Sequence, residues 1–269
     1  MLTHNLGYPR IGSQRELKKA SEKYWAGTTT LAELHQAARR IRQQNWLTQQ
    51  AAGLDLIPCH DFSYYDQVLD MSLLLGAVPA RYRPLIAQNR AYAELDLYFA
   101  MARGYQQHGL DITALEMTKW FDTNYHYLVP EFTRDQQFDL FSGQLFSEFE
   151  QARLVLGRAP KPVLIGPVSY LLLGKEKEAG FHRLELLPRL LPVYADILAR
   201  LQQQGAEWVQ LDEPYLALDL SAAERTAFET AYAQLARRFP GLKLLVATYF
   251  EGLRDNAATA LQLPIQALH

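Results

Sequence analysis

The sequence contains a single cysteine, Cys59, among its 269 residues. One cysteine excludes an internal disulfide, and no C-x-x-C pair offers the spacing of a zinc site. The seven histidines are scattered, and none forms an H-x-x-x-H or H-E-x-x-H pattern. We therefore expect no metal site in this chain and a reducing, cytoplasmic environment for it.

Long apolar runs and an excess of one charge are missing as well. The run from Val168 to Leu173 is among the longest and is far too short to span a bilayer. The start, MLTHNLGYPRIG, lacks the basic-then-apolar pattern of a signal peptide. With 27 basic and 29 acidic residues, nothing favours nucleic acid or an anionic membrane as partner. The composition is that of a soluble globular protein.

Glycine-rich phosphate loops do not occur either. GYPRIG, at residues 7–12, is not G-x-G-x-x-G, and no G-x-x-x-x-G-K-[ST] pattern is present. This absence disfavours a doubly wound nucleotide-binding sheet. What the chain does contain is short apolar runs that alternate with helical patterns, as in parallel α/β folds. Seven runs predict strands, at residues 4–12, 54–58, 114–121, 161–166, 207–212, 243–250 and 264–269.

Polar side chains gather just after these predicted strands, namely Asp61, Lys119, Asp122, Tyr170, Asp212, Glu213, Glu251 and His269. In a (β/α)8 barrel the functional face lies at the carboxyl ends of the strands. We therefore predict an α/β fold of the TIM-type (β/α)8 barrel class, with residues 1–269 as one domain. The predicted barrel is incomplete, because the chain ends on the seventh strand. Its unpaired strand edges favour self-association.

Helix boundaries are marked by local patterns. Ser13 with Glu16, and Thr30 with Glu33, have the spacing of a capping box. Longer helical patterns cover residues 183–204 and 221–239, and Gly205 lies where a glycine typically ends a helix.

Asp212 and Glu213 follow the predicted strand at 207–212. Neighbouring residues on a strand point to opposite faces, so only one of the two is expected at the barrel mouth. A hydrolase that uses paired carboxylates would need a partner from another strand, and the sequence offers Asp61, Asp122 or Glu251. The alternative is structural, because buried acids usually persist by pairing.

The first predicted helix carries Arg15, Lys18, Lys19 and Glu22 on one face. Cations in a first helical turn oppose the helix dipole unless an anion sits there, when amides and cations converge on it. Lys119, at the end of the predicted third strand, could approach the same mouth. A solvated basic face balanced by acids is the other interpretation.

Residues 114–132, ALEMTKWFDTNYHYLVPEF, crowd aromatic rings among charges. We predict that this stretch is the third strand with its exit loop. Tyrosine and tryptophan rings next to a few amides suit a flat ligand or a domain interface equally well.

Five segments together resemble one family: LGYPRIGSQRELKKASEKYWAG, EMTKWFDTNYHYLVPEF, KPVLIGPVSYLLLGK, WVQLDEPYLAL and TYFEGL. They are similar, in order and from residue 4 to the last residue, to the amino-terminal barrel of cobalamin-independent methionine synthases. The resemblance implies two face-to-face barrels in the full protein. It also implies methyl transfer from 5-methyltetrahydropteroyltri-glutamate to homocysteine.

The resemblance further implies a division of labour between the barrels. The carboxy-terminal barrel holds zinc, its cysteine and histidine ligands, and homocysteine. The amino-terminal barrel supports that site and helps to bind the polyglutamate tail of the folate. Carried over residue by residue, the tail site corresponds to Arg15, Glu16, Leu17 and Lys18, with Lys119 as a further contact. No catalytic residue carries over.

The sequence departs from the family by lacking the second barrel and its zinc ligands. We therefore expect the isolated chain to be catalytically inactive and Asp212–Pro214 to be structural. Two alternatives remain at this stage. One is an autonomous module that binds polyglutamylated folate, and the other is the independent hydrolase with paired carboxylates.

Overall fold

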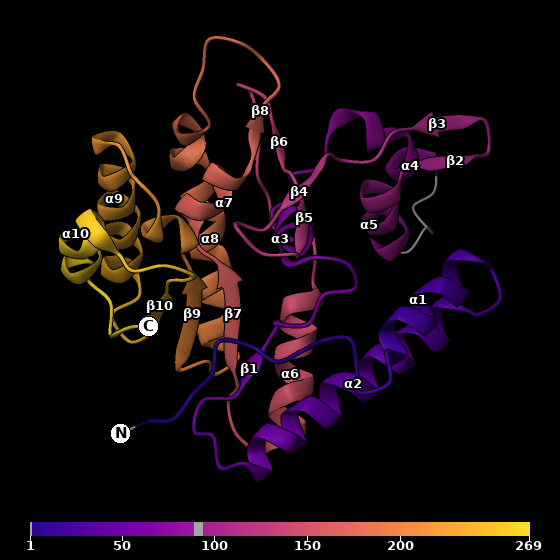
Figure 1. Ribbon diagram of the computed structural model, residues 1–269, viewed down its shortest axis with the longest axis horizontal. Coiled ribbons are helices and arrows are strands. Elements are labelled where there is room, and N and C mark those ends of the chain that lie inside the picture. Colours follow the sequence, from indigo (N-terminus) through magenta and orange to yellow (C-terminus); the bar gives the residue numbers. More distant parts are fainter. Residues whose placement is uncertain (1, 89–93) are drawn as a thin grey trace.

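The computed structural model describes residues 2–88 and 94–269 (Figure 1). The helices are α1 (Glu16–Trp25), α2 (Leu31–Ala51), α3 (Gln67–Leu74), α4 (Arg83–Gln88), α5 (Glu94–Arg103), α6 (Gln144–Leu156), α7 (Pro167–Leu173), α8 (Leu187–Gln203), α9 (Ala222–Arg238) and α10 (Ala257–Gln262). Short 3-10 turns cover Ala80–Tyr82, Arg183–Leu186, Pro214–Ala217 and Arg254–Asn256.

The strands fall into one larger sheet and three small ribbons. The larger sheet contains β1 (Pro58–Cys59), β7 (Lys161–Ile165), β9 (Trp208–Asp212), β10 (Lys243–Ala247) and β11 (Ala267–Leu268). The ribbons pair β2 (Tyr105–Gln107) with β3 (Leu110–Ile112), β4 (Met117–Lys119) with β5 (His126–Leu128), and β6 (Glu131–Phe132) with β8 (Lys175–Glu176).

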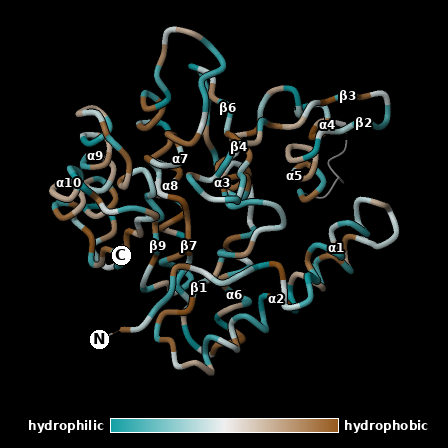
Figure 2. Tube along the Cα trace, viewed as in Figure 1, coloured by the Kyte–Doolittle hydropathy of each residue, from teal (hydrophilic) through white to brown (hydrophobic). Residues whose placement is uncertain are grey.

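All pairings in the five-stranded sheet are parallel, and the strands lie side by side in chain order. Every residue of β7 is buried, and in β9 and β10 only the first residue is not. Burial on both faces explains why these strands are apolar without clean alternation. Figure 2 shows β7 and β9 as hydrophobic runs near the centre of the molecule. The predicted α/β class is confirmed.

The amino-terminal segment contacts both edges of this sheet. His4 forms an isolated parallel bridge with Leu56, just before β1. Its ring also meets that of His269, just after β11, with ring centroids 5.1 Å apart. The predicted strand at residues 4–12 is thus reduced to one bridge, and the described strands form an arc that is not closed by hydrogen bonds.

The predicted third strand takes a different place. Met117–Lys119 lies outside the parallel sheet and pairs antiparallel with His126–Leu128. A tight turn causes the difference, since Trp120 N–H donates to Tyr125 O at 2.8 Å and Thr123 N–H to Trp120 O at 3.2 Å. A turn this short brings the chain back antiparallel, whereas a parallel neighbour needs a long crossover.

Two apolar cores support the arrangement. The larger lies between the sheet and α6, α7, α8 and α9, and the smaller gathers residues of α2, α3 and α5. Helix α1 packs on α2 and lies with it to one side of the sheet in Figure 1. No helix in the described part of the chain is long and apolar enough to cross a membrane.

The helix boundaries confirm one capping box and refute the other. Thr30 Oγ1 accepts from Glu33 N–H at 3.3 Å, while Glu33 Oε2 accepts from Thr30 N–H at 2.7 Å. Helix α1 instead begins at Glu16, with Arg15 as its N-cap and no side-chain cap. Gly205, with φ of 94°, follows α8 as the sequence predicts.

Candidate functional site

The basic segment before and within α1 is the first part of the candidate site. Arg15 has a left-handed backbone conformation, with φ of 61°, and its side chain is exposed. Lys18 is also exposed, and its pair with Glu22 spans 3.7 Å with both side chains 55% exposed. Such pairs contribute little to stability, so Lys18 is available to a stronger anion.

Glu16 and Leu17 contribute differently from the two cations. Leu17 is buried in the smaller core, so its side chain cannot meet a solute. The Glu16 carboxylate accepts from the backbone N–H of Gln14 at 2.9 Å. Hydrogen bonds from its own backbone N–H and from that of Gln14 lower the pKa of Glu16. We infer that Glu16 shapes the loop that presents Arg15.

The loop before α1 is tightly built. Gly12 has φ of 82°, and a Cβ there would lie 2.1 Å from Glu16 Oε2. The loop is closed by Arg15 N–H, which donates to Gly12 O at 3.2 Å. It forms one wall of a groove of about 770 Å³ whose other wall is α2. The groove runs beside the predicted tail site.

Lys119 lies on the β4–β5 hairpin rather than at the end of a sheet strand. Its side chain is exposed and makes no ion pair within residues 2–88 and 94–269. In Figure 1 the hairpin lies beside α3, clearly separate from α1. No contact between described residues joins Lys119 to Arg15 or Lys18. Four of the five predicted residues are adjacent, and the fifth stands apart.

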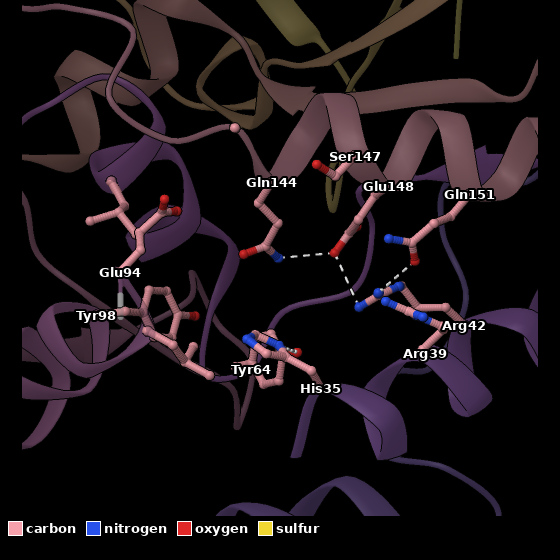
Figure 3. A pocket seen from close by; sticks show the side chains of 13 residues that line it. His35, Arg39, Arg42, Tyr64, Glu94, Tyr98, Gln144, Ser147, Glu148 and Gln151 are labelled. Atoms are coloured by element: carbon pink, nitrogen blue, oxygen red, sulfur yellow. Dashed lines mark hydrogen bonds and ion pairs between the residues drawn. The ribbon is translucent and has the colours of Figure 1, made fainter. Parts of the chain in front are cut away.

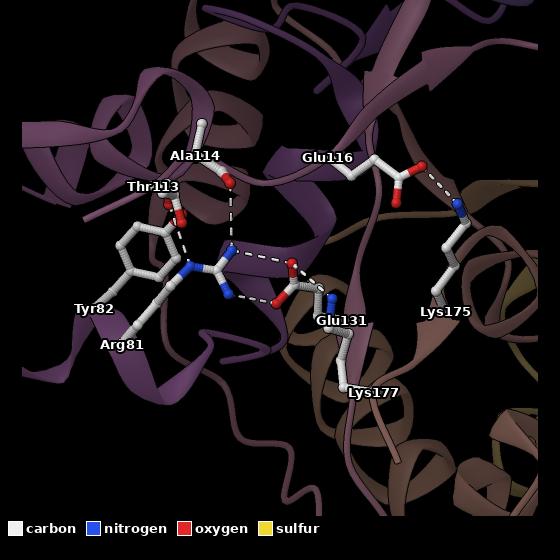
Figure 4. Close-up of polar contacts among 8 residues, drawn as sticks. All are labelled: Arg81, Tyr82, Thr113, Ala114, Glu116, Glu131, Lys175 and Lys177. Atoms are coloured by element: carbon white, nitrogen blue, oxygen red, sulfur yellow. Dashed lines mark hydrogen bonds and ion pairs between the residues drawn. The ribbon is translucent and has the colours of Figure 1, made fainter. Parts of the chain in front are cut away.

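Two acids of the 114–132 stretch, Glu116 and Glu131, pair with cations of neighbouring segments (Figure 4). Arg81 grips the Glu131 carboxylate with both terminal nitrogens, at 2.5 and 3.0 Å. Its Nε also donates to Thr113 O at 3.2 Å. Lys175 meets Glu116 at 2.5 Å. These acids therefore fasten the hairpin, which leaves Lys119 as its exposed cation.

A second constellation lies within the parallel sheet, between Lys161 at the amino end of β7 and Asp212 at the carboxyl end of β9. Lys161 is 1% exposed, and its ammonium donates to Asn5 O at 2.8 Å and to the Gln210 side-chain oxygen. Gln210 Nε2 donates in turn to Asp212 Oδ1 at 2.7 Å. Tyr249 donates its hydroxyl to Asp212 Oδ2 at 2.9 Å. Sequence inspection missed Lys161, although a lysine in an otherwise apolar strand is a usable signal.

The titration of these groups follows from burial. Desolvation raises the pKa of Asp212 to about 6, although Gln210 and Tyr249 favour its ionised form. Desolvation likewise lowers the pKa of Lys161 to about 8. The charges survive in the interior because each is hydrogen-bonded and they compensate each other.

Glu213 points the opposite way, as the strand geometry predicts. It is 0% exposed, and its carboxylate accepts from Ser169 N–H at 2.8 Å and from the Tyr232 hydroxyl at 2.9 Å. Desolvation raises the pKa of Glu213 to about 7. Gly166 leaves room for it, since a Cβ there would lie 2.1 Å from Glu213 Oε1. Glu213 joins α7 to α9 and serves the fold.

A cavity of about 500 Å³ opens at these strand ends. Asp61, Asp212, Trp120, Tyr249 and Phe250 are among its lining residues. Asp61 accepts from Tyr8 N–H at 2.8 Å, and desolvation raises its pKa to about 6.

The residues that line this cavity disfavour the hypothesis of a hydrolase with paired carboxylates. Asp122 and Glu251 are exposed and lie outside the cavity lining, so Asp61 is the one sequence-proposed partner that shares the cavity with Asp212. Both Asp212 oxygens already accept hydrogen bonds, and Glu213 is inaccessible. This geometry favours a structural role for the pair.

The described residues do not offer a metal centre. Within residues 2–88 and 94–269, no three histidine, cysteine or acidic side chains gather in a way that could hold a metal ion. Cys59 is buried, and desolvation raises the pKa of its thiol well above the ordinary value.

Comparisons with known proteins agree on the family. Residues 2–269 match the family model described as cobalamin-independent synthase, N-terminal domain. The chain is 61% identical over 269 residues to the 5-methyltetrahydropteroyltriglutamate–homocysteine methyltransferase of Cytophaga hutchinsonii, covering all of this chain and 35% of that protein. The protein of the same name from Flavobacterium johnsoniae is 58% identical, with 34% covered. The chain thus spans about a third of the length of these relatives.

Solved structures support the fold. The putative vitamin-B12 independent methionine synthase of Listeria monocytogenes aligns with a TM-score of 0.63 at 12% identity, over all of this chain and 73% of that one. The B12-independent methionine synthase of Shewanella sp. W3-18-1, solved with selenomethionine, gives 0.56 at 16% identity, over 88% and 59%. The resemblance in the motifs is confirmed, and the chain belongs to the cobalamin-independent methionine synthase family as its N-terminal domain.

Proposed function

We propose that this domain works within a methyltransferase that moves a methyl group from 5-methyltetrahydropteroyltri-glutamate to homocysteine, giving methionine. The observation that carries the proposal is the 61% identity, over the whole chain, to a protein named for that reaction. The domain contributes binding and support, because its own buried acids are engaged in the fold. Homocysteine, zinc and the catalytic groups belong to the carboxy-terminal barrel in this proposal.

The role of α1 is to bind the polyglutamate tail. Arg15 and Lys18 are exposed beside the first turn of a ten-residue helix, at the positive end of its dipole. Tail carboxylates would receive charge-assisted hydrogen bonds there. The Leu17 side chain is buried and its backbone N–H donates to Ile11 O at 3.2 Å, so Leu17 would position Arg15 and Lys18 rather than contact the tail. Lys119 would hold a more distant carboxylate of an extended tail.

The arc of five parallel strands is, in this proposal, part of a (β/α)8 barrel. Three observations support it: the parallel order along the chain, the bridge from His4 to Leu56, and the contact of His4 with His269. Lys161 also ties β7 to the amino-terminal segment, because its ammonium donates a hydrogen bond to the Asn5 carbonyl at 2.8 Å. Together with the amino-terminal segment, two further strands beside β11 would complete a ring of eight.

Methionine formation tests the proposal. The purified chain, given homocysteine, the tri-glutamate folate and zinc, should form no methionine. The same chain joined to the remainder found in its relatives should be active. Methionine formed by the 269-residue chain alone would contradict the division of labour. An inactive longer protein that folds and binds zinc would contradict the proposed reaction itself.

A further inference from the structure

We propose that a second cavity, between α2, α5 and α6, binds a small monocarboxylate with an apolar body (Figure 3). The cavity has a volume of about 400 Å³. Its position separates it from the tail site, because α2 presents different residues to each. Arg39 and Arg42 face this cavity, whereas Arg40 and Gln44 line the groove beside α1.

One wall is basic. His35, Arg39 and Arg42 stand three and four residues apart on α2, so they share one face of the helix. Arg42 is 7% exposed and pairs with Glu148 at 3.2 Å, while Gln151 accepts from it at 3.0 Å. Arg39 has no hydrogen bond or ion pair among the residues that the structure describes. The basic wall therefore carries one uncompensated guanidinium.

The buried pair behind this wall is incompletely satisfied. Glu148 is 1% exposed, and its Oε1 meets both Arg42 and Gln144, the latter at 2.9 Å. Arg42 Nε and Glu148 Oε2 are buried and have no partner in the described part of the chain. Unpaired buried polar atoms are costly, and the unpaired Glu148 oxygen, itself an acceptor, disfavours a second carboxylate close to this pair. A ligand carboxylate is therefore expected at Arg39, whose side chain is exposed, rather than at Arg42. Figure 3 shows the Arg42 and Glu148 side chains directed to the same space as Gln144 and Arg39.

The opposite side of the cavity determines which chemical groups the rest of the ligand can carry. Tyr64, Leu73 and Tyr98 supply buried apolar surface. Glu94 lies beyond them, and its carboxylate accepts from the Ser142 hydroxyl. A second anionic group on the ligand would meet Glu94. The cavity thus favours one carboxylate at Arg39 and an apolar body over the tyrosines.

Titration of the 269-residue chain with 3-phenylpropionate, followed by ligand-observed NMR and calorimetry, tests the proposal. We expect saturable binding that Arg39→Ala weakens about tenfold, the effect of losing one charge-assisted contact. Arg40→Ala is the matched control, because it removes the same charge from the same helix outside the cavity. The Arg40→Ala variant should bind 3-phenylpropionate with an affinity within about twofold of the wild type.

Succinate sharpens the test. It should bind less tightly than 3-phenylpropionate, and Glu94→Gln should narrow the difference. Absence of saturable binding up to the solubility limit would overturn the proposal, and so would equal losses in Arg39→Ala and Arg40→Ala. Arg15→Ala should leave this binding unchanged. The cavity and the folate-tail site can therefore fail independently.

Discussion

Lys161 in β7 and Arg15 before α1 are both cations, yet their surroundings differ. Lys161 is 1% exposed and donates hydrogen bonds to the Asn5 carbonyl and to the Gln210 side chain, which in turn donates to Asp212. Arg15 is exposed on a tight loop, and no described residue pairs with it. The strand ends are electrostatically complete without a ligand, whereas the surface of α1 is not.

The difference shows how charged motifs divide between folding and binding. A buried charge must be paired by the protein itself, since an unpaired one destabilises the fold. An exposed cation can remain unpaired at little cost, and it is then available to a ligand. The Asp212–Pro214 motif, which looks most chemical in the sequence, therefore belongs to the structural group. We propose that the basic helix α1 belongs to the binding group.

The largest effect is expected from the strand ends. Glu213→Ala should lower the free energy of unfolding by about 2–5 kcal/mol, because it leaves a cavity and deprives Ser169 N–H and the Tyr232 hydroxyl of their acceptor. Urea denaturation gives the value. The control is Glu251→Ala, an exposed acid expected to change stability by less than about 0.5 kcal/mol. Similar small losses in both variants would refute the structural assignment.

The pH dependence of stability follows from the same residue. The pKa of Glu213 rises from 4.5 to about 7 on folding, so the folded state binds more protons between these values. Unfolding free energy should therefore fall as pH rises from about 4.5 to 7, by on the order of 3 kcal/mol from this group. Glu213→Gln should flatten that part of the profile, measured by denaturation at several pH values. Parallel profiles for both proteins would contradict the buried-acid account.

A smaller effect is expected on the binding side. Lys119→Ala should weaken binding of the tri-glutamate folate by about 1–2 kcal/mol, because one charge-assisted contact is lost. Stability should hardly change, since Lys119 is exposed and unpaired among the described residues. Lys175→Ala is the control on the neighbouring ribbon, where the cation already pairs with Glu116. A larger loss of affinity in the control would remove Lys119 from the tail site.

The smallest expected effect is a difference in stability loss between substitutions at two helix starts that share the same sequence pattern. Thr30→Ala should cost about 1 kcal/mol of stability, because a complete capping box is lost. Ser13→Ala should cost less than about 0.5 kcal/mol, because Ser13 caps no helix. Thermal or urea unfolding distinguishes the two. Equal costs would show that the loop before α1 depends on Ser13 more than its hydrogen bonds suggest.

Local patterns predicted much of the sheet. The apolar runs at 161–166, 207–212 and 243–250 became β7, β9 and β10, because burial on both faces demands such runs. The run at 114–121 does form a strand, β4, but the prediction that it joins the parallel sheet was wrong. The turn at residues 122–125 pairs it with β5 instead. The Ser13 pattern misled for a related reason: Arg15, in a left-handed conformation, displaces the helix start.

Candidate site residues could be proposed from the sequence where they are adjacent in the chain, but not where they come together only in the fold. Arg15 to Lys18 form one segment, so a family motif suffices to find it. The network of Lys161, Gln210 and Tyr249 depends on side chains from β7, from β9 and from the loop after β10, which meet only after folding. The cavity at Arg39 likewise requires α2 and α6 to pack together, which no local pattern encodes.

The central claim is that the exposed cations of α1 bind the folate tail. The most direct measurement is titration calorimetry of this chain with tri-glutamate and mono-glutamate 5-methyltetrahydrofolate, for the wild type and for Arg15→Ala and Lys18→Ala. Each substitution should weaken tri-glutamate binding by about 1–3 kcal/mol and affect the mono-glutamate form less. Equal losses for both ligands, or none for either, would contradict the claim.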